Sequence, residues 1–117
     1  MATIKGYTNI EQSRKLAEIL PLESADMVYV HTVDLEGDEH YDIDFRNNQP
    51  LFEDDVCAWS LAALLGVLPQ IQGGKPAISL NDNYITYPHI SDLHTKADNL
   101  VDACYEMILK LHEQNLL

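Results

Sequence analysis

The sequence predicts a single α+β domain in which two antiparallel hairpins pack against a buried central helix and a long C-terminal helix. Its length of 117 residues is typical of one domain. Hydrophobic residues make up 46% of the chain, which is enough to build one core without disulfides. Helical and strand periodicities alternate along residues 1–117 and give the order α-β-β-α-β-β-α, with no internal repeat.

Residues 8–20 have the features of a first helix. Thr8 and Glu11 match a capping box, in which each side chain accepts a hydrogen bond from the backbone amide of the other residue. Apolar or small residues recur every three or four positions until Pro21, which ends the helix because the residue before a proline avoids helical geometry. In the link that follows, we expect Asp26 to accept hydrogen bonds from nearby backbone amides.

Residues 27–33 and 41–45 predict a β-hairpin. The first run is rich in β-branched and aromatic residues, and in the second apolar side chains alternate with charged ones. The second strand should therefore turn one apolar face toward the core and one charged face toward water. The polar segment 47–50, which ends in a proline, should break the strand.

A second helix is predicted after the acidic residues 53–55, because carboxylates favour the partial positive charge of a helix N-terminus. Its body, residues 56–65, is apolar almost all round, so we expect a central buried helix with Ser60 as a packing residue. We expect Cys57 in this helix and Cys104 in the last one to behave as small buried hydrophobes. A disulfide would remain geometrically possible if the two helices crossed there.

Residues 77–80 and 84–87 flank a polar turn and predict a second hairpin. After it, apolar residues spaced by alternating fours and threes predict a long final helix from about residue 95 to residue 113. Gly73, Gly74 and Lys75, which lie before this hairpin, lack the spacing of a phosphate-binding loop.

The chain carries a net charge of −12, concentrated in one segment. Residues 23–55 contain eleven acidic residues against Arg46 alone. This balance argues against direct binding to nucleic acid or an anionic membrane and allows a basic partner. Three interpretations stay open: a solvated hairpin whose carboxylates discourage edge pairing, an anionic docking face, or a metal site. The candidate binding residues of this acidic face are Asp34, Glu36, Asp38, Glu39, Asp42 and Asp44.

We find no catalytic signature, such as a Gly-x-Ser-x-Gly elbow around a serine. Two histidine pairs are candidates for a small metal-dependent enzyme: His31 with His40, which should face each other across the first hairpin, and His89 with His94. Neither spacing fits a strong zinc pattern. We therefore expect no catalytic residue, metal or cofactor, and the question of enzymatic activity stays open with a preference against it.

Three stretches resemble a family of small uncharacterised proteins of gut Bacteroides-type bacteria and their phages or mobile elements. They are YTNIEQSRKLAEILPLESADM at residues 7–27, WSLAALLGVLP at residues 59–69 and VDACYEMILKLHE at residues 101–113. The resemblance implies a bacterial cytoplasm and a mobile-element context. Because the family has no established activity, the resemblance assigns a role to no residue.

The expected function is that of an accessory or protein-interaction domain without enzymatic activity. The first residues show no apolar run of signal-peptide length and no segment approaches a membrane span, so we expect a cytoplasmic protein. A sharper form of the hypothesis is an acidic decoy that binds a basic protein through residues 34–44. The alternatives are the metal-dependent enzyme and a structural homo-oligomer, in which a second copy covers a strand edge or the long helix.

Overall fold

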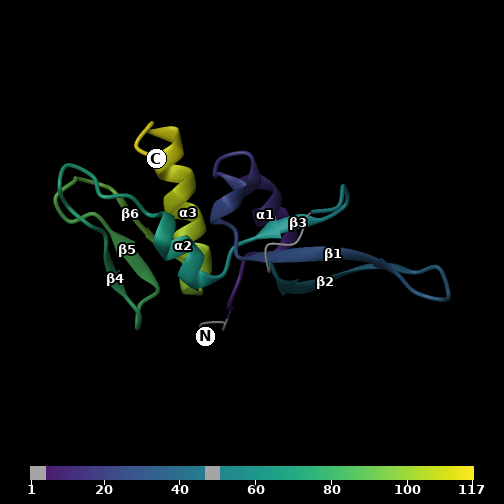
Figure 1. Ribbon diagram of the computed structural model, residues 1–117. Helices are drawn as coiled ribbons and strands as arrows, with labels where there is room; N and C mark the ends of the chain where they lie inside the picture. Colours follow the sequence, from purple (N-terminus) through teal and green to yellow (C-terminus); the bar gives the residue numbers. More distant parts are fainter. Residues whose placement is uncertain (1–4, 47–50) are drawn as a thin grey trace.

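The computed structural model describes residues 5–46 and 51–117; the break predicted at 47–50 lies outside these residues. The α+β class and the two hairpins are confirmed, with two more short strands than predicted. Two antiparallel sheets, ordered β2-β1-β3 and β4-β5-β6, lie on either side of the helices (Figure 1). The elements are α1 (Ile10–Ala17), a 3-10 turn (Leu22–Ser24), β1 (Met27–Val33), β2 (Glu39–Phe45), β3 (Val56–Ala58), α2 (Leu61–Val67), β4 (Ala77–Ser79), β5 (Tyr84–Thr86), β6 (His94–Lys96) and α3 (Leu100–Glu113).

Helix α1 begins one residue later than predicted, because Asn9 and not Thr8 is its N-cap. The Asn9 side chain accepts from the amide of Gln12 at 2.8 Å, and the Gln12 side chain accepts from the amide of Asn9 at 3.1 Å. Thr8 is fully buried, and its hydroxyl shares a 2.7 Å hydrogen bond with that of Ser13. Tertiary contacts therefore decide between two overlapping capping boxes. The helix ends at Ala17, earlier than the predicted stop.

The predicted central helix is wrong in its first half. Residues 56–58 form strand β3, which pairs with the beginning of β1. Ser60 is the N-cap of α2, and its hydroxyl accepts from the amide of Ala63 at 3.2 Å. A short, continuous apolar run fits a buried strand as well as a helix, and here the pairing with β1 decides. Helix α2 is short and half-covered, with Leu64 as its buried residue.

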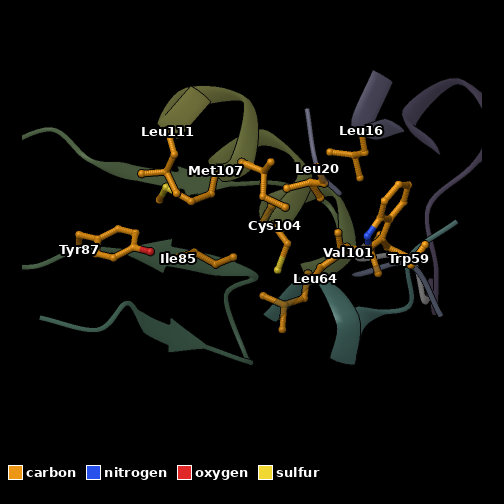
Figure 2. Close-up of a cluster of buried hydrophobic side chains, with 14 of the residues drawn as sticks. Leu16, Leu20, Trp59, Leu64, Ile85, Tyr87, Val101, Cys104, Met107 and Leu111 are labelled. Carbon is orange, nitrogen blue, oxygen red and sulfur yellow. The ribbon is translucent and has the colours of Figure 1, made fainter. Parts of the chain in front are cut away.

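The final helix begins later than predicted, since residues 94–96 form the edge strand β6. Asn99 is the N-cap of α3, and its side chain accepts from the amide of Asp102 at 2.8 Å. The buried face of α3 is the centre of the hydrophobic core (Figure 2). Side chains from α1, α2, β5 and the residues after β3 and β5 belong to the same cluster, among them Leu16, Trp59, Leu64, Ile85 and Tyr87.

Both cysteines are free thiols and are buried, as expected. Both belong to the hydrophobic core, Cys104 from α3 and Cys57 from strand β3 in place of the predicted helix. Burial raises the pKa of the Cys104 thiol to about 12. It also raises the pKa of Cys57, which Asp55 raises further and Arg46 opposes. Both thiols therefore stay protonated at neutral pH, and their surroundings are those of packing residues.

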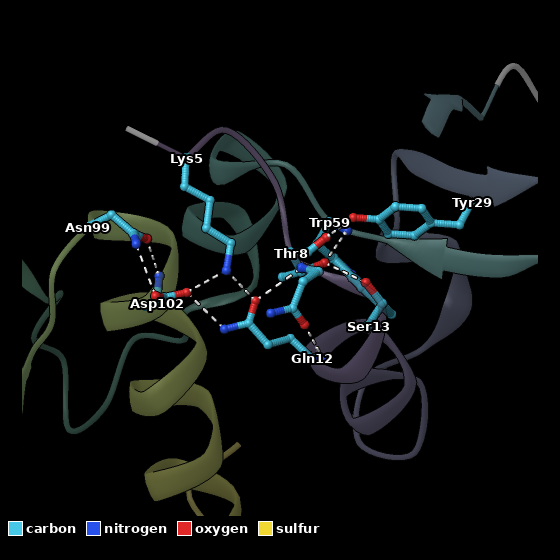
Figure 3. Close-up of polar contacts among 9 residues, drawn as sticks. Lys5, Thr8, Gln12, Ser13, Tyr29, Trp59, Asn99 and Asp102 are labelled. Carbon is cyan, nitrogen blue, oxygen red and sulfur yellow. Dashed lines mark hydrogen bonds and ion pairs between the residues drawn. The ribbon is translucent and has the colours of Figure 1, made fainter. Parts of the chain in front are cut away.

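A polar cluster ties the start of the described chain to α1 and α3 (Figure 3). The Lys5 ammonium lies 2.7 Å from the Asp102 carboxylate, which also accepts from the side chains of Gln12 at 2.8 Å and Asn99 at 2.9 Å. Burial acts to raise the pKa of Asp102, but these hydrogen bonds outweigh it and hold the pKa below its ordinary value. The carboxylate is therefore ionised and saturated with donors, which is typical of a structural group.

The molecule is elongated, with extents of 54 × 32 × 22 Å and a radius of gyration of 15.6 Å. A compact chain of this length would have a radius of gyration of about 13 Å. The β1–β2 hairpin accounts for the difference, because it projects from the body with its turn farthest from α3 (Figure 1). None of the helices among the described residues has the length and apolarity needed to cross a bilayer.

Candidate docking surface

The projecting hairpin has two faces, which its register defines. The strands pair from Met27 opposite Phe45 to Val33 opposite Glu39. Since directly opposed residues share a face, the side chains sort into two sets. The tyrosine face carries Met27, Tyr29, His31, Val33, Glu39, Tyr41, Ile43 and Phe45, and the aspartate face carries Val28, Val30, Thr32, His40, Asp42 and Asp44.

The turn at the tip is built by Asp34. Its carboxylate accepts hydrogen bonds from the amides of Glu36 and Asp38, each at 2.9 Å. Its carbonyl accepts from Gly37, whose φ of 85° is a left-handed conformation that favours glycine. Asp34 is therefore occupied in forming the turn, while Glu36 and Asp38 are exposed beside it.

The six predicted acidic residues do not share one face. Asp42 and Asp44 lie on the aspartate face, Glu39 lies on the tyrosine face, and the other three are at the tip. Asp42 accepts from the hydroxyl of Thr32 at 3.2 Å and lies 3.3 Å from Nε2 of His40. Asp44 accepts from the amide of Phe45 at 2.8 Å. The exposed charge thus follows the outer strand β2 and the turn, and it does not form a single patch.

His31 and His40 do not face each other. His31 is opposite Tyr41 on the tyrosine face, while His40 is opposite Thr32 on the aspartate face. A metal site that joins the two imidazoles is therefore excluded in this arrangement. The His31 ring lies 5.2 Å from the ring of Tyr41, and its two nitrogens lie 3.7 Å from carboxylates, one of Glu39 and one of Asp54.

The second histidine pair is also separated by its contacts. Nε2 of His89 is hydrogen-bonded to the carbonyl of Ile71 at 2.6 Å, whereas the ring of His94 packs against that of Tyr84 on the small sheet. Within residues 5–46 and 51–117, no group of three or more His, Cys, Asp or Glu side chains is arranged to hold a metal ion.

Exposed apolar side chains accompany the charges, and they contradict the expectation that the apolar face of the second strand meets the core. Phe45 is 68% exposed and Val33 is 56% exposed, while Tyr41 and Ile43 are only half-buried. Phe52, which is 76% exposed, helps to line a small pocket of about 140 Å³ beside the aspartate face. Alternation identified the two faces, but sequence alone could not show that the main core lies elsewhere.

A larger open pocket, of about 460 Å³, lies where the hairpin meets α1. Its lining combines apolar and charged groups, including Leu22, Tyr41, Phe52, Asp54 and Arg14. Its only basic side chain among the described residues is Arg14, and its lining includes no imidazole. The pocket is therefore an extension of the exposed hairpin surface and offers no set of groups for acid–base or nucleophilic chemistry.

Hydrogen bonds join the base of the hairpin to the body of the protein. The Tyr29 hydroxyl donates to the carbonyl of Thr8 at 2.7 Å (Figure 3). Asp26 accepts from both the amide and the hydroxyl of Ser60, so its partner is 34 residues away and the predicted local bonding is wrong. Arg46 donates from its guanidinium to the carbonyl of Leu22. The hairpin is thus a projection fixed at one end.

Comparison with known proteins adds no assignment: no protein-family model, curated protein or solved structure matches the chain.

Proposed function

We propose that the chain is a protein-interaction domain that presents the β1–β2 hairpin to a basic partner. The observation that carries the proposal is the projection of this hairpin beyond the core, with exposed apolar side chains beside exposed carboxylates. Apolar contacts can supply affinity, and the carboxylates can select and attract a positively charged partner. The proposal includes the expected bacterial or mobile-element context, in which a basic nucleic-acid-binding protein would be a natural target.

The charge distribution favours a basic partner over a second copy of the chain. Two hairpins brought together along β2 would place the Asp42 and Asp44 carboxylates of both copies close to one another. Opposed like charges on neighbouring strands are destabilising. A strand or surface that carries lysine or arginine would turn the same carboxylates into attractive contacts.

The test compares matched affinity columns. One column carries the protein, and a second carries the variant with Asp38→Asn, Asp42→Asn and Asp44→Asn. These replacements remove charge but keep a side-chain oxygen that can accept the bonds from Thr32 and the Phe45 amide. A control column carries a variant in which three exposed acidic residues far from the hairpin are neutralised, Asp98→Asn, Glu106→Gln and Glu113→Gln.

A lysate is applied at about 0.05 M salt and eluted at about 0.5 M, where charge interactions beyond a few ångströms are screened. We expect a basic protein to bind to the unmodified and control columns, to elute with salt, and to be lost from the hairpin variant. Its affinity would then be measured with purified components. A retained set that is identical on all three columns would refute the proposal, because hairpin charge would then select nothing.

A further inference from the structure

The outer edge of β2 has no strand beside it within residues 5–46 and 51–117. The hydrogen bonds at the two ends of the β1–β2 ladder show which residues of β2 direct their backbone groups toward this edge. At one end of the β1–β2 ladder the amide of Arg46 donates to the carbonyl of Asp26, and at the other the amide of Asp34 donates to the carbonyl of Asp38. In an antiparallel pair, bonded and non-bonded residue pairs alternate. His40, Asp42 and Asp44 therefore direct their backbone groups toward β1, and the residues between them direct theirs outward.

The amide of Phe45 donates to the carboxylate of Asp44 and not to β1, which supports this assignment of inward and outward backbone groups. Tyr41 and Ile43, in the middle of the strand, thus have N–H and C=O groups that point away from the sheet. In the described part of the chain no strand pairs with this edge, since β2 is the outermost strand of its sheet. An extended segment placed along it could form main-chain hydrogen bonds to both residues.

We infer that β2 binds its partner by strand addition, taking an extended segment in which basic and apolar residues alternate. This inference rests on the proposed function and specifies the partner's chemistry. In an antiparallel arrangement, apolar residues of the segment would lie opposite Tyr41 and Ile43 and exchange hydrogen bonds with them. The basic residues between would lie on the aspartate face, beside Asp42 and Asp44. The strand edge thus selects a segment in which apolar and basic residues alternate, and the carboxylates select its positive charge.

The carboxylates also explain why the edge remains available. Exposed edges invite pairing between identical chains, and charged side chains on the edge strand discourage it. Asp42 and Asp44 oppose self-pairing and pairing with acidic or neutral strands, but a basic strand reverses the sign of the interaction. The same two residues therefore exclude a second copy and admit the proposed partner.

The test uses synthetic heptapeptides that match the seven residues of β2 in length. The parent peptide alternates valine and lysine, with acetylated and amidated ends. In one derivative the valine nitrogens are methylated, which removes the donors that face β2 in the antiparallel register. In its matched control the lysine nitrogens are methylated, which leaves those donors intact. A third peptide has the same composition with its lysines contiguous.

Titration calorimetry with the complete chain should show that the parent and the lysine-methylated peptide bind, and that valine methylation weakens binding at least roughly tenfold. The contiguous-lysine peptide should bind more weakly than the parent. In the protein, Ile43→Pro removes one backbone N–H that points outward and leaves the hydrogen bonds to β1 in place. It should therefore weaken binding of the parent peptide, whereas Ile43→Val should not. Circular dichroism checks that each variant is folded.

Equal binding of both methylated peptides, or no binding of the parent, would overturn strand addition. The proposed function is judged separately by the columns. If the variant with Asp38→Asn, Asp42→Asn and Asp44→Asn retains less of a basic protein while peptide methylation has no effect, the hairpin docks by charge and strand addition is wrong. If neither change has an effect, both proposals fail.

Discussion

The contact between Gly74 and His89 allows a quantitative test of the loop before the second hairpin. A Cβ on Gly74 would lie 2.3 Å from Cε1 and 2.6 Å from Nδ1 of the His89 ring. The ring would have to turn away, and its Nε2 would lose the 2.6 Å hydrogen bond to the carbonyl of Ile71. Loss of one such bond costs about 1 kcal/mol, and a strained side chain adds a comparable amount. We therefore expect Gly74→Ala to lower the free energy of unfolding by about 1–2 kcal/mol.

Urea unfolding of a double-mutant cycle with His89→Ala measures the contact directly. Once the ring is absent, Gly74→Ala should be neutral or stabilising, so the two substitutions should couple by about 1–2 kcal/mol. Gly66 in α2 is the matched control, because a Cβ there meets nothing within 4 Å. Gly66→Ala should stabilise the protein by about 0.5 kcal/mol. An equal cost of Gly74→Ala in both backgrounds would refute the reasoning.

Three further predictions concern the core and the polar clusters. The pKa of Asp102 is lower in the folded chain than its ordinary 3.8, so its stabilising contribution is complete above that pH and is lost as pH falls through the folded-state pKa. Asp102→Asn should therefore flatten the pH dependence of stability between about pH 5 and about pH 3, as measured by urea unfolding at each pH. If the variant lost as much stability as the unmodified protein over this pH range, the reasoning would be contradicted. Cys57 and Cys104 should react with a disulfide reagent at pH 8 only as fast as the chain opens, and rapid labelling of both would show that they are accessible. Ser60→Ala should cost about 1–2 kcal/mol in the same urea assay, because it removes the cap of α2 and a donor to Asp26; a loss below about 0.5 kcal/mol would mean that the cap is dispensable.

Local signals were sufficient for the hairpins and for the existence of the three helices. Alternation in β2 and polar turn residues fix a hairpin within a few residues of sequence, so no distant contact has to be known. The predicted boundaries of the helices were less accurate than the predicted strands of the hairpins. The caps Ser60 and Asn99 are both visible in the sequence, each directly before the first helical residue. For α2, the acidic residues 53–55 and the apolar run after them gave a stronger competing signal, and for α3 the apolar spacing could be extended back to residue 95.

The candidate site depended on contacts that no local pattern contains. The opposite placement of His31 and His40 follows from the length of the turn, because a shift of one residue would exchange the faces of one strand. Asp26 was expected to bond locally, yet it bonds to Ser60, which is close only after β3 pairs with β1. The exposure of Phe45 likewise depends on where the core forms.

The position of the β1–β2 hairpin outside the core affects how the protein can evolve. Side chains such as Asp42 and Phe45 are exposed, and substitutions at such positions usually change stability by less than about 0.5 kcal/mol. Mutation can therefore alter the exposed residues of β2, such as Asp42, Asp44 and Phe45, with little risk to folding, whereas changes to the buried face of α3 disturb the packing of the core. If the hairpin binds a partner as proposed, the residues that select the partner and those that keep the chain folded are largely separate, and a lineage can change the first set while it preserves the second.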